Sequence, residues 1–272
     1  MRKRLFAHLL GGSPYLILDN IVGTFDSPSL AAFLTAGEFS DRILGKSKTV
    51  ALPNRTLTWL TGNNLTLAGD MPRRVLVAYI DPESETPFQR EFDFCPLQYC
   101  LAHRRELVEA GVAVIMGYRA NAKTRAKGRM ASFETWDDLV RQPVAWLGRE
   151  VQPGQWSDPM DSVVQAVSLD PERQSLGELL TSWRAVYGER AITAAELVKD
   201  LGGVGQFDDD KTNLAEAVKD LAGGAVLSSK GLGRVLTYRQ GRIVDGLALA
   251  KAGRGKKAVQ WSVRRIEGGL GV

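Results

Sequence analysis

Residues 15-YLILDN-20 indicate the fold class of the first half of the chain. An apolar run that ends in a carboxylate is typical of a buried parallel strand, which carries its acid to the carboxyl edge of a sheet. Residues 57-LTWLT-61 form a similar run that ends before polar Asn63 and Asn64, and residues 75-VLVAYID-81 predict a third buried strand. We therefore expect an α/β fold.

Helices are expected between and after these strands. Ser27 is placed to cap the first helix and Asp70 to act as a second cap. Two β-type runs flank Pro53-Asn54, which is a turn signal and predicts a surface hairpin. The expected helices cover residues 28–39, 97–122 and 132–148. The tryptophans expected in the core, from their apolar surroundings, are Trp59, Trp136, Trp146 and Trp183.

The last hundred residues follow a different pattern. Thr193-x-x-Glu196 and Asn213-x-x-Glu216 are capping boxes that predict two helix starts. Helices followed by two β-type runs and a basic loop are typical of a winged-helix domain. The expected helices cover 175–188, 192–201, 213–222 and 229–239, and the β-type runs cover 242–250 and 258–266. The expected divisions are 1–148, a linker over 149–174, and 175–272.

Positive charge gathers in this terminal domain. The chain has a net charge of +4, yet residues 228–267 hold ten basic residues against Asp245 and Glu267, so that segment is +8 and the remainder −4. A basic terminus on a nearly neutral body predicts a polyanion partner, most simply DNA. The alternatives are a solvated surface and a protein-docking domain. The expected phosphate contacts are Lys230, Arg234 and Arg239 on the helix, and Lys251, Arg254, Lys256 and Lys257 on the wing.

Composition excludes several other classes of protein. The two cysteines, Cys95 and Cys100, are too few for a disulfide framework and form no CxxC pair. The basic start is followed by too short an apolar run for a signal peptide, and no segment approaches the length of a membrane span. We expect a cytoplasmic protein without a membrane partner.

Residues 40-SDRILGKS-47 partly match the phosphate-loop pattern GxxxxGK[ST]. Gly45, Lys46 and Ser47 fit the pattern, but Ser40 replaces the first glycine. A phosphate loop follows a strand and opens a helix, so that its backbone N–H groups face the phosphates. This segment follows a helix-like stretch, and we expect an ordinary loop.

Taken together, the first 150 residues resemble the C-terminal half of phage and prophage primase-helicase ATPases of the AAA+ class. The resemblance rests on LILDN, SPSLAAFLT, DRILG, TGNN, GDMPRR and SFETWDDLVRQPVAWLG, and it covers about half of the chain. It implies a partial P-loop ATPase core with a helical lid, ahead of the winged-helix domain.

The resemblance also assigns roles to individual residues. Asp19 would be the Walker B acid that holds Mg²⁺, and Asn63, or alternatively Asn64, would be the sensor. Arg73 or Arg74 would be the arginine finger. Asn20 stands where the family has a second acid. Related helicases carry a DNA-touching hairpin before the sensor strand, where Lys46, Lys48 and Arg55 could act, although a plain surface hairpin is the simpler expectation.

The sequence contains no complete GxxxxGK[ST] motif. ATP and Mg²⁺ are therefore expected as cofactors only when a missing N-terminal region is supplied. We expect a truncated product or a piece of a split protein, which forms a homo-oligomeric ring or joins an upstream-encoded half. Two hypotheses follow: a DNA-directed ATPase or helicase subunit of a mobile element that does not hydrolyse ATP alone, or a non-enzymatic DNA-binding adaptor.

Overall fold

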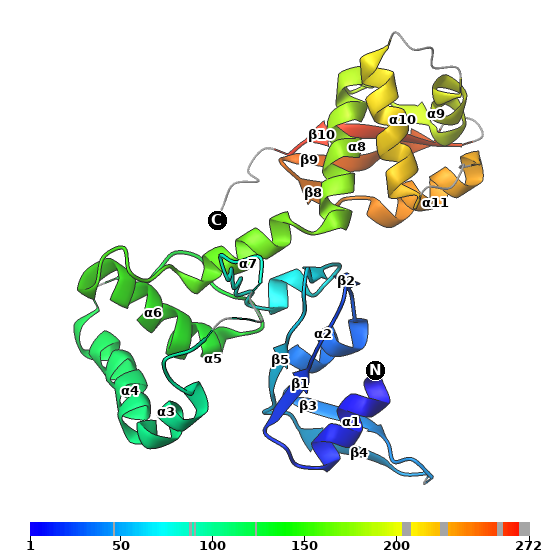
Figure 1. Ribbon diagram of the computed structural model, residues 1–272. Coiled ribbons are helices and arrows are strands. Elements are labelled where there is room, and N and C mark those ends of the chain that lie inside the picture. The colour runs from blue at the N-terminus through cyan, green and yellow to red at the C-terminus, as the bar shows by residue number, and fades with distance from the viewer. Residues whose placement is uncertain are drawn as a thin grey trace. The chain divides into compact units, whose positions relative to one another are not determined.

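The computed structural model describes residues 1–45, 47–86, 89, 91–122, 124–202, 208–223, 228–254 and 258–266. The chain divides into two compact units, Met1–Val167 and Ser168–Val272. Both units mix helices and strands: the first holds small sheets and the second a four-stranded antiparallel sheet (Figure 1). The region expected as a linker, 149–174, contains helix α7 (Pro159–Ser168).

In the first unit, two helices cover one face of a parallel strand pair. Strands β1 and β5 pair in parallel, and Leu16, Leu18 and Leu60 pack on a buried cluster to which α1 and α2 contribute most residues. Ser27 caps α2 as expected, because its Oγ accepts a hydrogen bond from the Leu30 N–H at 3.3 Å. The elements are α1 (Arg2–Leu10), β1 (Tyr15–Leu18), β2 (Thr24–Phe25), α2 (Pro28–Thr35), β3 (Glu38–Arg42), β4 (Thr49–Pro53), β5 (Leu57–Leu60), β6 (Thr66–Leu67) and the 3-10 helix η1 (Pro72–Arg74).

The expected hairpin around Pro53-Asn54 is wrong. β4 pairs in antiparallel fashion with β3, from Glu38↔Pro53 to Arg42↔Thr49, while β5 pairs with β1. The predicted helix over 28–39 ends at Thr35, and its last residues enter β3. Both errors have one cause: Gly37 ends the helical pattern, and the strand that follows takes β4 as its partner.

The third strand expected over 75–81 is also wrong. This segment is irregular, and Tyr79 and Ile80 are exposed by 63% and 91%. A strand needs a neighbour that accepts its backbone hydrogen bonds. Here the side chain of Ser162 replaces a neighbouring strand at Val77. Its Oγ accepts a hydrogen bond from the Val77 N–H at 2.9 Å and donates one to the Val77 carbonyl oxygen at 2.7 Å.

The β1–β5 pair is buried on one face only. Tyr15 lies opposite Leu57, and Ile17 opposite Trp59, so these four side chains share the second face. All four are more than half exposed, at 57% to 60%. The expectations of buried strands and of a core position for Trp59 are therefore wrong for this face, which no described element covers.

The rest of the first unit is helical. The helix predicted over 97–122 is two helices that meet at His103, and the helix predicted over 132–148 is one helical run with two π-helical turns. The elements are α3 (Pro96–Ala102), α4 (Arg104–Asn121), α5 (Glu134–Trp136), the π-helix η3 (Asp137–Arg141), α6 (Gln142–Trp146) and the π-helix η4 (Leu147–Val151). Trp146 is buried as expected and meets Tyr118 of α4, with ring centroids 6.2 Å apart.

The second unit packs its helices on an antiparallel sheet of order β7-β10-β9-β8. Trp183 and Trp261 lie in one buried cluster with the leucines of the surrounding helices. The elements are α8 (Pro171–Tyr187), β7 (Ile192–Thr193), α9 (Ala194–Leu201), α10 (Asp209–Leu221), α11 (Ser229–Arg239), β8 (Ile243–Val244), β9 (Leu247–Arg254) and β10 (Val259–Arg265). The predicted helices and the two long strands of the ribbon are present.

The two predicted capping boxes have different outcomes. Thr193 and Glu196 form the reciprocal hydrogen bonds of a capping box at the start of α9. Asn213, by contrast, lies inside α10, which is capped by Asp208 through a hydrogen bond from the Lys211 N–H at 3.2 Å. The run of acids before Asn213 extends the helix by a turn, because acidic residues favour a helix N-terminus.

Candidate functional site

Helix α11 presents a basic face on the second unit. Its N-cap Ser228 accepts a hydrogen bond from the Gly231 N–H at 3.1 Å, and Leu232 and Leu236 anchor the helix in the core. Lys230 and Arg234 lie on the exposed side. The sequence of the helix, SKGLGRVLTYR, contains no carboxylate. The exposed side of the helix can therefore attract an anion through its cations, and the helix itself has no carboxylate that would repel the anion.

Arg239, which was expected beside Lys230 and Arg234, is turned inward. Its side chain is 14% exposed, and its guanidinium lies 3.5 Å from Glu172 on the first turn of α8. Burial lowers the pKa of Arg239, and the charge of Glu172 opposes that shift. Arg239 is thus a residue that joins α11 to α8, and its charge is already paired.

Sequence reasoning missed Tyr238 and Arg242 at the end of this helix. Tyr238 is exposed by 65%, and the guanidinium carbon of Arg242 lies 4.7 Å from its ring centroid. Arg242 also pairs with Glu172 at 2.9 Å. The four-residue spacing of Lys230, Arg234 and Tyr238 was a signal for a shared face. The ion pairs with Glu172 could not be predicted from this spacing, because Glu172 lies on α8, which is far from α11 in the sequence.

The β9–β10 ribbon carries further exposed cations. Lys251 is exposed, and its ammonium nitrogen lies 5.6 Å from the ring centroid of Trp261. Arg264 and Arg265 are exposed at the end of β10. Arg254 ends β9. Its side chain and the predicted wing residues Lys256 and Lys257 lie outside the described residues.

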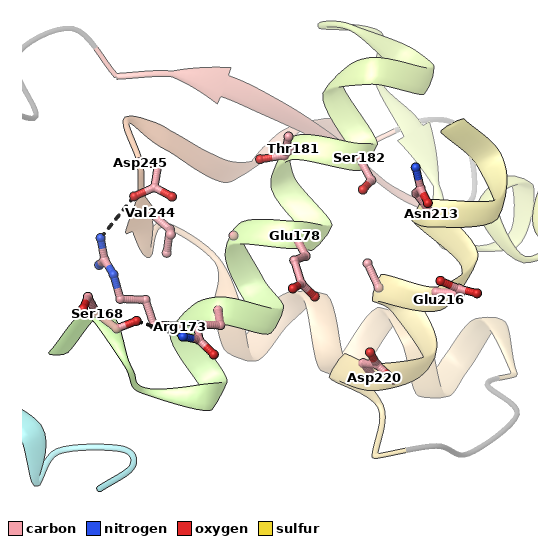
Figure 2. A pocket seen from close by; sticks show the side chains of 13 residues that line it. Ser168, Arg173, Glu178, Thr181, Ser182, Asn213, Glu216, Asp220, Val244 and Asp245 are labelled. Carbon is pink, nitrogen blue, oxygen red and sulfur yellow. Dashed lines mark hydrogen bonds and ion pairs between the residues drawn. The ribbon is translucent and has the colours of Figure 1, made fainter. Parts of the chain in front are cut away.

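An acidic groove of about 1000 Å³ lies elsewhere on the second unit. Helices α8 and α10 and strand β8 line it, and Figure 2 shows its side chains. Arg173 and Asp245 pair at one end, at 3.5 Å. The carboxylates of the lining outnumber the single guanidinium: they belong to Glu178, Glu216, Asp220 and Asp245. The basic and the acidic surfaces of this unit therefore lie on different elements.

Asp19 lies at the carboxyl end of β1, next to the end of β5. The Thr61 hydroxyl donates a hydrogen bond to Asp19 Oδ1 and accepts one from the Asn20 N–H at 3.2 Å. The predicted sensors Asn63 and Asn64 are exposed in the turn that follows. Sequence reasoning missed Thr61, although it is the last residue of the β-type run that precedes them.

The turn after Thr61 has little room for any side chain at Gly62. A Cβ there would lie 2.1 Å from the Ile21 carbonyl oxygen. The same Ile21 donates its N–H to the Thr61 carbonyl at 2.9 Å. The loops that follow β1 and β5 are thus fastened to each other, which holds Thr61 beside Asp19.

Arg73 and Arg74 both pair with Asp70. Arg73 Nε donates to one carboxylate oxygen at 2.6 Å, and a terminal nitrogen of Arg74 donates to the other at 2.7 Å. Burial raises the pKa of Asp70, but the two guanidinium groups outweigh it and the pKa lies below its ordinary value. Asp70 is therefore the counter-ion of the two arginines. It is not the helix cap that was expected, because the N-cap of η1 is Met71. Arg73 is the more exposed arginine, at 55% against 12%.

The segment 40-SDRILGKS-47 begins with the last three residues of β3 and lies between the paired strands β3 and β4. Gly45 has a φ of +77°, and strand β4, not a helix, follows Ser47. Lys46 lies outside the described residues, whereas Lys48 and Arg55 are exposed. The described residues thus offer an acid at a sheet edge but no helix N-terminus after the GKS segment, so they do not fit a bound nucleotide phosphate by themselves.

The described part of the chain offers neither a metal centre nor a membrane-spanning helix. No group of three or more histidine, cysteine or acidic side chains is arranged there to hold a metal ion. No helix among the described residues has the length and apolar character needed to cross a membrane. In comparisons with known proteins, no family model and no curated protein matches this chain.

Proposed function

We propose that this chain binds DNA through α11 and the β9–β10 ribbon, which act as a winged-helix domain. The observation that carries the proposal is the exposed face of α11, where Lys230 and Arg234 stand opposite the buried leucines in a helix without carboxylates. Cations on a helix that precedes a β-ribbon suit contact with a nucleic-acid backbone.

The order of elements in the second unit supports this proposal. A helix is followed by the short strand β7, by further helices that end with α11, and then by the ribbon. β7 pairs with β10, so the sheet joins the start of the domain to its last strand, and α11 packs on α9. Winged-helix domains use this succession of elements to present one helix and one loop to DNA.

The cations of this surface would hold phosphates without selecting a sequence. Lys230, Arg234 and Lys251 are exposed, so each can reach a phosphate oxygen. Such contacts position a protein on DNA, while base edges supply specificity. Arg239 would support the helix from within through Glu172. Because phosphate binding releases counter-ions, the affinity would fall steeply with salt concentration.

The test is the affinity of the full chain for a labelled duplex, measured by fluorescence anisotropy at several salt concentrations. Replacing Lys230 and Arg234 with alanine should weaken binding at least tenfold and reduce the salt slope by about two, one for each lost phosphate contact. Lys199→Ala with Lys219→Ala removes the same charge from exposed positions of α9 and α10. That control should leave both quantities nearly unchanged, and an equal loss in both double variants would refute the proposal.

For the first unit, we propose that it belongs to a DNA-directed ATPase or helicase subunit of a mobile element. Asp19 and Thr61 stand at the carboxyl ends of parallel strands, which is where α/β proteins place ligand-binding groups. Arg73 could turn toward a neighbouring subunit because it is exposed. The phosphate-binding loop would come from another polypeptide segment, and in its presence Asp19 would hold Mg²⁺ through water.

The second candidate is a non-enzymatic DNA-binding adaptor. It is favoured by the hairpin at the GKS segment and by Asp70, which engages both arginines. ATP hydrolysis distinguishes the two candidates. A subunit should turn over ATP once a segment with a complete phosphate loop is supplied, and Asp19→Ala should abolish that turnover. An adaptor should bind DNA and stay inactive in every combination.

A further inference from the structure

Tyr238 is an exposed aromatic ring that the fold of the second unit does not require. It lies on the side of α11 away from Leu232 and Leu236 and exposes 65% of its surface. Exposed tyrosines can serve as platforms for flat ligands, because the ring face attracts both cations and aromatic rings. The groups around Tyr238 indicate which ligand suits it.

Two guanidinium groups lie over this ring before any ligand arrives, and the side chain is still mostly exposed. The central carbon of Arg242 lies 4.7 Å from the ring centroid, and that of Arg239 lies 5.5 Å away. Glu172 holds both, at 2.9 Å from Arg242 and 3.5 Å from Arg239. The carboxylate offsets one of the two positive charges and fixes the position of both guanidinium groups, so the cluster around the ring is preorganised.

The cluster also continues the row of cations on α11. Lys230, Arg234 and Tyr238 are spaced four residues apart, or about 6 Å along the helix axis for each step. A nucleic-acid strand whose phosphates meet Lys230 and Arg234 would therefore arrive next to Tyr238. Gly233 lies beside this row and no other atom occupies the space where its Cβ would be, so a backbone can approach closely there.

We propose that Tyr238, with Arg242 beside it, stacks on an unpaired nucleobase, so that the chain prefers a duplex carrying a single-stranded arm to a blunt duplex. This inference rests on the proposed DNA binding and adds the form of DNA. Bases inside a duplex have both faces covered by their neighbours, whereas an unpaired base offers a free face to an aromatic side chain.

The test compares the full chain with its Tyr238→Ala and Tyr238→Phe variants on two labelled probes. One probe is a blunt duplex and the other is the same duplex with a ten-nucleotide unpaired arm. Tyr238→Ala should lower the affinity for the armed probe by about 5- to 150-fold, the range that one stacked base contributes. Its affinity for the blunt probe should change by less than twofold, and Tyr238→Phe should keep the preference.

A direct readout is photocrosslinking to iodouracil placed in the arm, which should yield a crosslinked peptide containing Tyr238. Equal losses on both probes, or no loss on either, would overturn the stacking role. Wild-type binding of both probes with equal affinity would overturn it while leaving DNA binding intact. Failure of the wild-type chain to bind either probe would overturn both proposals.

Discussion

Arg141 is the side chain on which the helical part of the first unit depends most. Its guanidinium is 1% exposed and contacts Asp137 at 2.8 Å and Asp158 at 2.8 and 2.9 Å. It also donates to the carbonyl oxygens of Lys127 and Gly128, at 2.7 and 3.0 Å. One residue thus fastens the basic loop before α5 and the start of α7 to the helical run between them. The sequence predicted that run but gave no sign of its buried arginine, whose partners lie outside the helix.

Replacing Arg141 with methionine should destabilise the first unit by about 3–5 kcal/mol. The substitution leaves Asp137, which is fully buried, without its main cation, and an unpaired buried charge is costly. Urea unfolding followed by tryptophan fluorescence measures the change. Arg105→Met is the matched control, because Arg105 is 89% exposed in its pair with Glu109 and should contribute little. Similar midpoints for both variants would contradict this account.

Acid should weaken the same network. Burial raises the pKa of Asp158, but hydrogen bonds from Arg141 and from the Met160 N–H lower it more, and the pKa lies below its ordinary value of 3.8. A carboxyl with a depressed folded-state pKa adds stability above its unfolded pKa and loses it as the pH falls through the folded value. The urea concentration at the midpoint of unfolding should therefore fall when the pH is lowered below about 4. In Arg141→Met the midpoint should depend less on pH than in the wild-type chain. If the two proteins show the same pH dependence, Arg141 is not the cause of the acid sensitivity.

At the scale of elements, local pattern was informative and strand partnership was not. The helices of the second unit and the run at 15–18 were predictable from capping residues and apolar periodicity. The apolar run at 75–81 looked like the others, yet it is not a strand, because Ser162 binds Val77 where a neighbouring strand would. For the same reason the partner of β4 could not be predicted, since an apolar run does not specify its neighbour.

The exposed face of β1 and β5 should make the chain associate with itself or a partner. Ile17→Thr with Trp59→Thr should leave the free energy of unfolding within about 0.5 kcal/mol, because both side chains are mostly exposed. The same change should reduce self-association in sedimentation velocity runs, since contiguous apolar patches of this kind mark interaction surfaces. Leu18→Thr, on the covered face, should instead destabilise the unit. Unchanged association in the double variant would refute this function for the exposed face.

At the scale of the molecule, each unit has a core of its own. The second unit buries Trp183 and Trp261 among the leucines of α8 to α11, and the first gathers Phe33 and Met71 with the residues of α1 and α2. Charge asymmetry and composition predicted a separate basic domain over residues 175–272, after a linker over 149–174. They could not predict α7, because its residues follow a stretch rich in proline and glycine.

A fragment of residues 168–272 should fold without the first unit. All members of its core cluster lie within the fragment. Far-ultraviolet circular dichroism should show a cooperative thermal transition, and the fragment should bind the labelled duplex within about threefold of the full chain. A fragment that is unfolded at 25 °C would show that the first unit contributes to this core.

The acidic groove gives the second unit a further property. Negative side chains line α8 and α10, while positive ones lie on α11 and the ribbon, so the unit carries a permanent electric dipole moment. In the field of a polyanion such a body experiences a torque, which turns its positive end forward before contact. Association should therefore be faster than for an isotropic cation of equal net charge.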